Sequence, residues 1–215
     1  MDRKILVYGS SISWGAWDEA GGWVDRLKQY LNKKTIDNKG EYYCMLYNLG
    51  ISGDDTIKVL ARFESELLTG RFNAGEELII VFEMGINDSI YINAEKGFRT
   101  PREKFQENLK ELINLSKKYT DKIVFVGLSP AVDEILDPIP WHPVGTYSTK
   151  YIKDFDGMIR DVCKEKNLLF IDTLNLFIKS DYKKLLTPDG IHPNSEGHKF
   201  IFEIVKNELE KANLI

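Results

Sequence analysis

Cysteine is scarce in this chain of 215 residues, and long apolar runs are missing from it. The two cysteines, Cys44 and Cys163, lie in strand-like and helix-like patterns, which predicts two buried thiols rather than a disulfide. No apolar run approaches the length of a membrane span, and no signal-peptide core follows Met1. The chain is therefore expected to be cytoplasmic and to have no membrane partner.

An excess of basic charge is also missing. Lys and Arg together number 29 against 33 Asp and Glu, so the formal net charge is −4. This balance speaks against nucleic acid as a partner and leaves a neutral ester or sugar substrate open. No internal repeat, low-complexity tract or linker divides the sequence, which predicts a single domain over residues 1–215.

Short apolar runs that do not alternate with polar residues predict strands buried on both faces. These runs are residues 5–8, 42–48, 78–83, 123–128 and 168–172. Apolar residues at helical spacing follow each run, at residues 23–31, 57–67, 105–113, 151–162 and 200–209. The alternation predicts an α/β fold with right-handed crossovers, a three-layer α/β/α sandwich around a five-stranded parallel sheet. Thr100 is expected to cap the third of these helices, with Pro101 in its first turn.

Ligands of an open parallel sheet bind beyond the carboxyl ends of its strands, so the residues after each strand are the candidates for a site. After the first strand, Ser11 follows Gly9 and Ser10 in a turn that can aim a hydroxyl toward a helix N-terminus. After the second, Gly53 can bring a backbone N–H close to a ligand. After the third, the Asn87 amide can donate to the same oxyanion.

The Gly53 turn precedes the second helical stripe, which Asp54 or Asp55 could cap. Each of these turns also has a plain structural interpretation, because serine, glycine and asparagine are ordinary turn residues.

Histidine occurs only three times. His192 follows Asp189 by three residues, so the carboxylate can accept from one imidazole nitrogen and leave the other free to take a serine proton. His198 begins the last helix, where a solvated or capping role is expected. His142 lies in the longest irregular stretch, residues 129–147, and is expected to border the site.

These segments resemble, in order and approximate spacing, the Ser, Gly, Asn and His blocks of the SGNH subgroup of GDSL-type lipases and acylhydrolases. The most specific are the block from Gly85 to Asp88 and the pair Asp189 and His192. The resemblance runs from Ile5 through the last helix. It implies the SGNH hydrolase fold, with a flavodoxin-like five-stranded parallel sheet, and no metal or cofactor.

The resemblance also implies a role for each residue. Ser11 is expected to be the nucleophile and the first oxyanion donor through its backbone N–H. Gly53 is expected to be the second donor by its backbone N–H, and Asn87 the third by its side chain. His192 is expected to be the general base, oriented by Asp189.

One position departs from the family pattern. Where the family usually has Gly-Asp-Ser, this chain has Gly9, Ser10 and Ser11, so a carboxylate is missing beside the proposed nucleophile. The Gly-x-Ser-x-Gly elbow of the larger α/β-hydrolases is absent, since residue 13 is a serine.

The expected function is hydrolysis of carboxylic esters through an acyl-enzyme, with short acyl groups on carbohydrates or small molecules as substrates. The expected substrate contacts are Ser10, Trp14, Trp141 and His142, with Trp17, Tyr147 and Phe98 as further aromatic residues near the site. Two other functions stay open. A serine-rich first turn could cradle the phosphate of a flavin, or the domain could be inactive and bind acylated glycans.

Overall fold

The computed structural model describes residues 2–69, 71–73 and 75–215. Its centre is a parallel sheet with strand order β2-β1-β3-β6-β8. The strands are β1 (Arg3–Gly9), β2 (Cys44–Gly50), β3 (Glu77–Glu83), β6 (Ile123–Val126) and β8 (Leu169–Ile171). All five predicted strands are present, and their parallel arrangement is confirmed.

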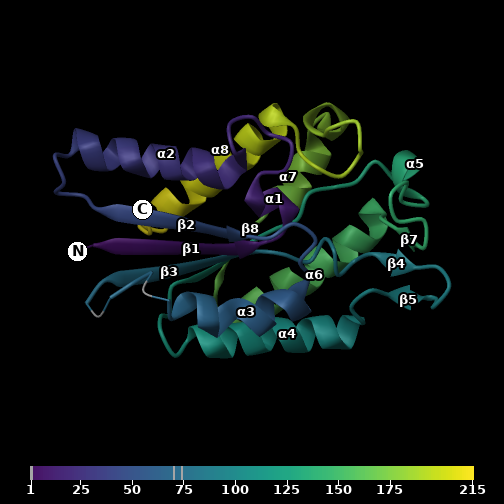
Figure 1. The fold of residues 1–215 in the computed structure, drawn as a ribbon, viewed down its shortest axis with the longest axis horizontal. Helices are drawn as coiled ribbons and strands as arrows, with labels where there is room; N and C mark the ends of the chain where they lie inside the picture. Colours follow the sequence, from purple (N-terminus) through teal and green to yellow (C-terminus); the bar gives the residue numbers. More distant parts are fainter. Residues whose placement is uncertain (1, 70, 74) are drawn as a thin grey trace.

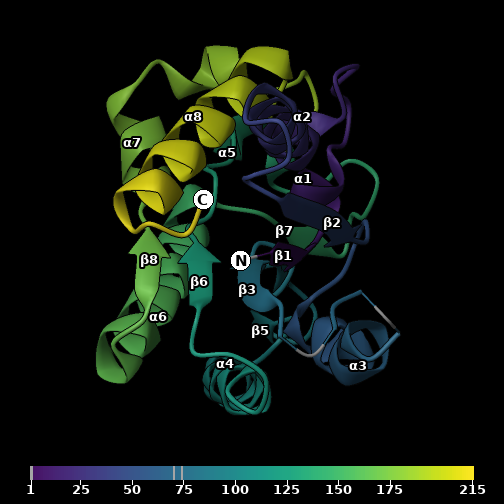
Figure 2. The ribbon, with the colours of Figure 1, turned by 90° about the vertical axis from the view of Figure 1, so that its left-hand side faces the viewer.

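Helices cover both faces of this sheet, as the views in Figures 1 and 2 show. One face carries α1 (Ser11–Trp14), α2 (Gly22–Asp37), α7 (Thr173–Lys179) and α8 (Ser195–Lys211). The other carries α3 (Thr56–Leu67), α4 (Arg102–Ser116) and α6 (Thr149–Lys166). Each long helix turns its apolar stripe to the sheet, which produces the three-layer sandwich predicted from the periodicity.

Strand β1 lies at the middle of the core, and its residues Ile5 to Tyr8 are inaccessible to solvent. It pairs along its whole length with β2 on one side and β3 on the other, and Gly9 is level with both Gly50 and Glu83. The three strands therefore end together, and the loops that follow them leave from the same edge. The chain also reverses its direction across the sheet here, the place where ligands bind in such folds.

A small second sheet was not predicted. It has strand order β5-β4-β7, formed by β4 (Tyr91–Ile92), β5 (Gly97–Phe98) and β7 (Gly145–Thr146). The stretch 129–147, expected to be irregular, thus contains β7 and the short helix α5 (Asp133–Leu136). Elements of two to four residues have no measurable periodicity, so the sequence pattern could not reveal them. A short 3-10 helix, η1 (Tyr182–Leu185), precedes the last segment.

Helix α4 begins one residue later than expected. Pro101 is its N-cap, and Thr100 lies outside the helix with a fully buried side chain. Helix α3 is capped by Asp55, whose carboxylate accepts the backbone N–H of Lys58. The capping prediction is therefore wrong for Thr100 and confirmed for Asp55.

The two cysteines are free and buried, as predicted. Within the described residues, no helix combines the length and apolar character needed to cross a membrane.

Candidate active site

The first strand delivers Ser11 directly to the edge of the sheet. Ser10 is the N-cap of α1, and Ser11 is its first residue. A Cβ at Gly9 would overlap the Ser13 side chain, so glycine is what lets this turn of helix sit directly on the strand end. Ser11 is 7% exposed, so its side chain is buried rather than on an open surface.

The structure brings Ser11, His192 and Asp189 together as the sequence predicts. Nε2 of His192 lies 3.0 Å from Oγ of Ser11, and Nδ1 lies 2.7 Å from Oδ2 of Asp189. A carboxylate can only accept, so Nδ1 carries the imidazole proton and donates it to Asp189. Nε2 is then free to accept the Ser11 proton, the arrangement that a serine nucleophile needs.

Asp189 is held in its ionised form by its surroundings. Burial alone would raise the pKa of its carboxyl, but hydrogen bonds from His192, the Ile191 N–H and the Thr187 hydroxyl outweigh this and keep that pKa well below its usual range. Oδ1 accepts from Thr187 Oγ1 at 2.7 Å and from the N–H groups of Ile191 and His192, both at 3.0 Å. The carboxylate therefore stays charged and fixed while it orients the imidazole.

Gly53 and Asn87 lie in the loops that follow β2 and β3, on either side of β1. Gly53 has a φ of 81°, a conformation that glycine adopts at little cost, and a Cβ there would meet no neighbour. Asn87 Nδ2 donates to the backbone carbonyl of Asp54 at 2.8 Å, which ties the amide to the glycine turn. An amide nitrogen has two N–H groups, so one remains for a ligand.

The orientation of the Asn87 amide is set by a residue whose role was not predicted. The Tyr147 hydroxyl donates to Oδ1 of Asn87 at 2.6 Å, and burial raises the pKa of this tyrosine well above its usual range. With Oδ1 occupied by a donor, the NH2 group of Asn87 must face the opposite way. No local pattern marks Tyr147 for this role, because it is 60 residues away in the chain.

The loop that carries Asn87 is anchored in the core by its neighbour. Both carboxylate oxygens of Asp88 accept the N–H of Thr56 at 3.1 Å, and Oδ1 also accepts the Thr56 hydroxyl at 2.6 Å. Asn108 of α4 donates to that hydroxyl oxygen at 3.0 Å. Burial raises the pKa of Asp88 to about 6. These contacts fix the loop after β3 to α3 and α4.

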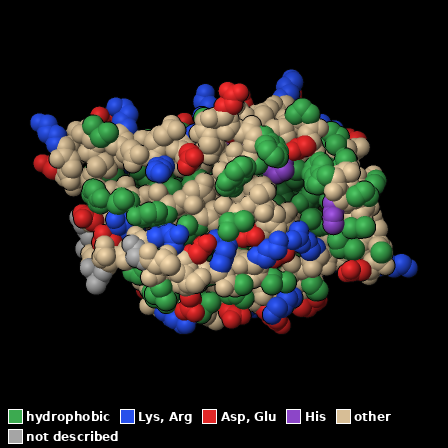
Figure 3. Space-filling view, in the orientation of Figure 1, with side chains coloured by type: hydrophobic (Ala, Val, Ile, Leu, Met, Phe, Trp, Pro, Cys, Tyr) green, Lys and Arg blue, Asp and Glu red, His purple; other side chains and the backbone are tan. Residues whose placement is uncertain are grey.

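A pocket of about 230 Å³ opens beside these donors. Its lining includes both Gly53 and Asn87, together with Ile90, Arg99, Ile139, Trp141, His142 and Tyr147. Arg99 forms an ion pair with Asp55 at 3.0 Å, so its charge is already matched. Figure 3 shows histidine side chains with hydrophobic side chains around them at the end of the molecule to which the strands point.

Of the four residues expected to contact the substrate, two line this pocket and two do not. Trp141 and His142 line the pocket, as expected for residues that border the site. Trp14 is 52% exposed on α1 but does not line this pocket, and Ser10 is 1% exposed. The Ser10 hydroxyl is buried without a hydrogen-bond partner among the described residues, so it offers no surface to a substrate.

His198 differs from its expected role. It is fully buried, not solvated, and bridges α8 to the segment after α1. Nδ1 accepts the Trp23 N–H at 3.3 Å, and Nε2 lies 3.2 Å from the Ala16 carbonyl. Burial lowers the pKa of this imidazole, which agrees with a neutral ring that donates to Ala16 and accepts from Trp23.

A buried acid beneath the turn that carries Ser11 was also missed. Glu83, the last residue of β3, accepts the Ser13 hydroxyl at 2.6 Å and is 2% exposed. Burial raises its pKa to about 8, against a partly compensating hydrogen bond from Ser13. The turn that carries Ser11 therefore rests on a carboxyl group that is protonated at neutral pH.

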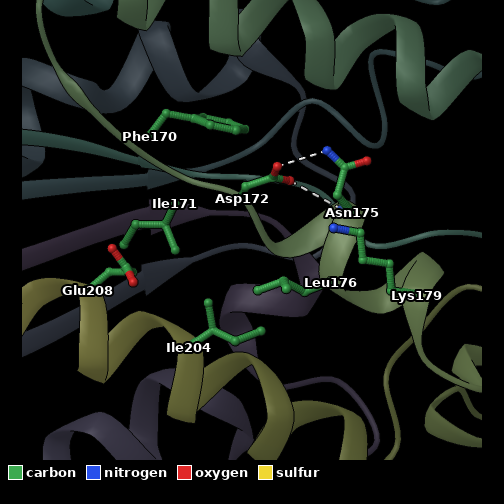
Figure 4. A pocket seen from close by; sticks show the side chains of 8 residues that line it. All are labelled: Phe170, Ile171, Asp172, Asn175, Leu176, Lys179, Ile204 and Glu208. Carbon is green, nitrogen blue, oxygen red and sulfur yellow. Dashed lines mark hydrogen bonds between the residues drawn. The ribbon is translucent and has the colours of Figure 1, made fainter.

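A separate hollow of about 290 Å³ lies against the edge strand β8, between α7 and α8 (Figure 4). Asp172 points to Asn175 there and caps α7 through bonds of 3.2 Å and 2.8 Å to its backbone and side-chain nitrogens. None of the predicted site residues lines this hollow.

The parallel sheet, its switch point beside β1 and the residues after its strands define the fold of an SGNH hydrolase. The chain belongs to the GDSL-like lipase/acylhydrolase family, whose sequence model matches residues 7–200. It is therefore a carboxylic ester hydrolase, and the flavin-binding alternative is not favoured.

Solved structures of similar fold include a lipase/acylhydrolase and acetylxylan esterases. A lipase/acylhydrolase from Enterococcus faecalis has 22% identity and a TM-score of 0.75, over 98% of this chain and 96% of that one. A catalytic mutant of an acetylxylan esterase from Geobacillus stearothermophilus has 20% identity and a TM-score of 0.71, over 96% and 93%. Another acetyl xylan esterase has 21% identity and a TM-score of 0.72, over 96% and 99%. No protein of curated function matches the sequence.

Proposed function

We propose that this protein is a serine esterase that removes short acyl groups, such as acetyl groups on carbohydrates, through an acyl-enzyme on Ser11. The observation that carries the proposal is the continuous path from Ser11 Oγ through the His192 imidazole to Asp189, with distances of 3.0 Å and 2.7 Å. Family membership supplies the reaction class.

In the proposed reaction, Nε2 of His192 takes the Ser11 proton as Oγ attacks the ester carbonyl. The new C–O bond places a negative charge on the carbonyl oxygen, which the Ser11 and Gly53 N–H groups and the Asn87 amide would stabilise. The imidazolium then gives its proton to the leaving alcohol as the ester C–O bond breaks. Water, activated in the same way, releases the acid and frees Ser11.

The surroundings of the site favour a small acyl group. A pocket of about 230 Å³ lies beside the proposed oxyanion donors, and its two isoleucines, Ile90 and Ile139, suit a methyl or short alkyl group. Three of the four tryptophans are more than half exposed: Trp14 at the end of α1, and Trp17 and Trp141 in loops. Exposed aromatic rings of this kind mark binding surfaces, and their flat faces suit sugar rings.

The nucleophile is tested by labelling the protein with a fluorophosphonate probe and by measuring hydrolysis of p-nitrophenyl acetate. Wild type should be labelled and active, whereas Ser11→Ala should be unlabelled and inactive with the same melting temperature. Ser10→Ala is the matched control for the adjacent hydroxyl and should keep the label. Comparable turnover by Ser11→Ala would overturn the proposal, and a folded wild type that takes no label would favour an inactive glycan-binding domain.

The substrate class is tested by a series of p-nitrophenyl esters of increasing acyl length beside acetylated xylo-oligosaccharides. The highest kcat/KM is expected for acetyl esters, with a decline as the chain outgrows the pocket. A maximum at long chains would contradict the assignment to short acyl groups and would point to a lipase.

A further inference from the structure

Trp17 is the one residue from outside the segment 187–192 that donates a hydrogen bond to Asp189 among the described side chains. Its indole Nε1 lies 3.0 Å from Oδ2 of Asp189 and 3.1 Å from Nδ1 of His192. Nδ1 already carries the proton that it donates to Asp189, so Oδ2 is the only acceptor open to the indole N–H. The indole and imidazole rings also meet edge to face, with centroids 5.7 Å apart.

The backbone of Trp17 adopts a left-handed conformation, with a φ of 66°. A bulky side chain rarely takes this conformation, and strained residues persist where their surroundings hold them in place, often at functional sites. The conformation projects the side chain out of the turn, where it is 66% exposed. Burial therefore does not explain why the strain is kept.

Both neighbours of Trp17 are firmly held. Ala16 is buried, and its carbonyl lies 3.2 Å from Nε2 of His198. Asp18 is buried, pairs with Arg26 at 2.9 Å and accepts the N–H of Gly22 at 3.1 Å. The turn is thus pinned on each side of the strained residue, and the indole is its only exposed aromatic group aimed at the Asp189 carboxylate.

We propose that Trp17 is a positioning residue for the Asp189 and His192 pair. Its indole N–H fixes Oδ2 from outside, and its ring edge supports the imidazole so that Nε2 stays within reach of Ser11. Trp17 and Ser11 both follow β1, so one short segment carries the indole and Ser11 to Asp189 and His192, although Trp17 and Asp189 are 172 residues apart. The inference rests on the proposed serine esterase function.

Trp17→Phe removes the N–H and keeps an aromatic ring. The carboxylate then loses one donor and stabilises an imidazolium more strongly. We expect kcat to fall about 5- to 10-fold and the acid limb of the kcat/KM profile to move up by roughly 0.3 to 0.5 pH unit.

The other titratable groups around His192 are unchanged in this variant. They are Asp189 on its own segment, Ser11 on α1, His198 on α8, and Tyr147, whose hydroxyl feels the Asp189 charge. Trp14→Phe is the matched control in the same segment: whatever its effect on KM, it should leave the acid limb where wild type has it. If Trp17→Phe lowers kcat but leaves the acid limb where wild type has it, Trp17 merely lines the site, and the positioning role is overturned.

The strain is tested separately with Trp17→Gly and Trp17→Ala. Both lose the indole and should lose activity alike, but Gly accepts the left-handed backbone and should melt at the higher temperature. A higher melting temperature for the alanine variant would contradict the conclusion that the backbone of residue 17 is strained.

A readout without catalysis separates this inference from the proposed function. The ¹⁵N–¹H signal of the Trp17 indole, assigned by its absence in Trp17→Phe, should move with pH in wild type and stay fixed in the His192→Ala, Asp189→Asn double variant. If this pH-dependent signal is seen in a protein that hydrolyses no ester, the contact stands and the proposed function is rejected. A signal that is insensitive to both residues would overturn the contact itself.

Discussion

The proposed acid–base side of the site, Asp189 and His192, is supported by an exposed residue, whereas the proposed oxyanion side, Gly53 and Asn87, is supported by a buried one. Asp189 and His192 keep side-chain exposures of 23% and 15%, and their external support, Trp17, is 66% exposed. Asn87 and its support Tyr147 are only 5% and 6% exposed. The proposed base must exchange protons with substrate and water, while an oxyanion donor only has to stay in place.

The difference in burial determines how strongly the loss of each supporting hydrogen bond should affect catalysis. A hydrogen bond shielded from water is electrostatically stronger than an exposed one, and breaking it leaves a buried polar atom unpaired. The Tyr147 to Asn87 contact, at 2.6 Å in the interior, should therefore be coupled to catalysis more tightly than the Trp17 to Asp189 contact at the surface.

The largest effect is expected on the acid–base side. Among the described residues, the His192 imidazole is the one group bonded to Ser11 Oγ that can take its proton, so His192→Ala should lower kcat for p-nitrophenyl acetate about 10⁴-fold. His142→Ala serves as the control histidine, because it lines the pocket without contacting Ser11, and should change kcat by less than about tenfold. Equal losses in the two variants would reject His192 as the base.

The next effect tests the oxyanion side. Asn87→Ala removes a proposed donor and should lower kcat by about 10²- to 10³-fold with a smaller change in KM. Asn108→Ala is the matched control, since it deletes a second buried asparagine, one that bonds Thr56, the partner of Asp88. It should lower the melting temperature while kcat stays within a few-fold of wild type, and a loss of catalysis as great as that of Asn87→Ala would show that both act through folding.

A smaller effect measures the internal support itself. Tyr147→Phe leaves the Asn87 amide held by its bond to the Asp54 carbonyl alone and should reduce kcat about tenfold with little change in KM. The loss should vanish when Asn87 is already alanine, because the hydroxyl acts through that amide. Tyr8→Phe, which removes a buried hydroxyl bonded to the Phe63 carbonyl at 3.1 Å, is the control for hydroxyl deletion. Additive losses in the double variant would separate Tyr147 from the oxyanion side.

The smallest effect on catalysis concerns the acid beneath the nucleophile. Folding raises the Glu83 pKa from 4.5 to about 8, so the folded protein holds a proton that the unfolded chain releases above about pH 4.5. Stability from this group is complete below pH 4.5 and is lost as the pH rises toward 8. Glu83→Gln should therefore flatten the melting temperature between pH 5 and pH 8, with roughly 2–4 °C gained at pH 8 for each kcal/mol recovered.

In that variant, kcat at pH 7 should remain close to wild type, because Gln can still accept the Ser13 hydroxyl. A pH dependence of melting identical to that of wild type would show that Glu83 is ionised in the folded protein.

Local pattern alone identified the five strands, the long helices and the residues that follow the first three strands. Periodicity is a property of neighbouring residues, and the Asp189 to His192 spacing is also local. The roles expected of Gly53 and Asn87 came from the family resemblance, because by themselves both are ordinary turn residues. Local pattern missed the strands β4, β5 and β7, because two residues are too few to show a period.

Only the tertiary structure decided how the site is held. Trp17 meets Asp189 across 172 residues, Tyr147 meets Asn87 across 60, and Ser13 meets Glu83 across 70. Each contact exists because parallel strands end level at one edge of the sheet and bring distant loops together, which no local spacing encodes. The sequence determined which residues are available for the proposed chemistry, and the packing of these loops decided which neighbours orient them.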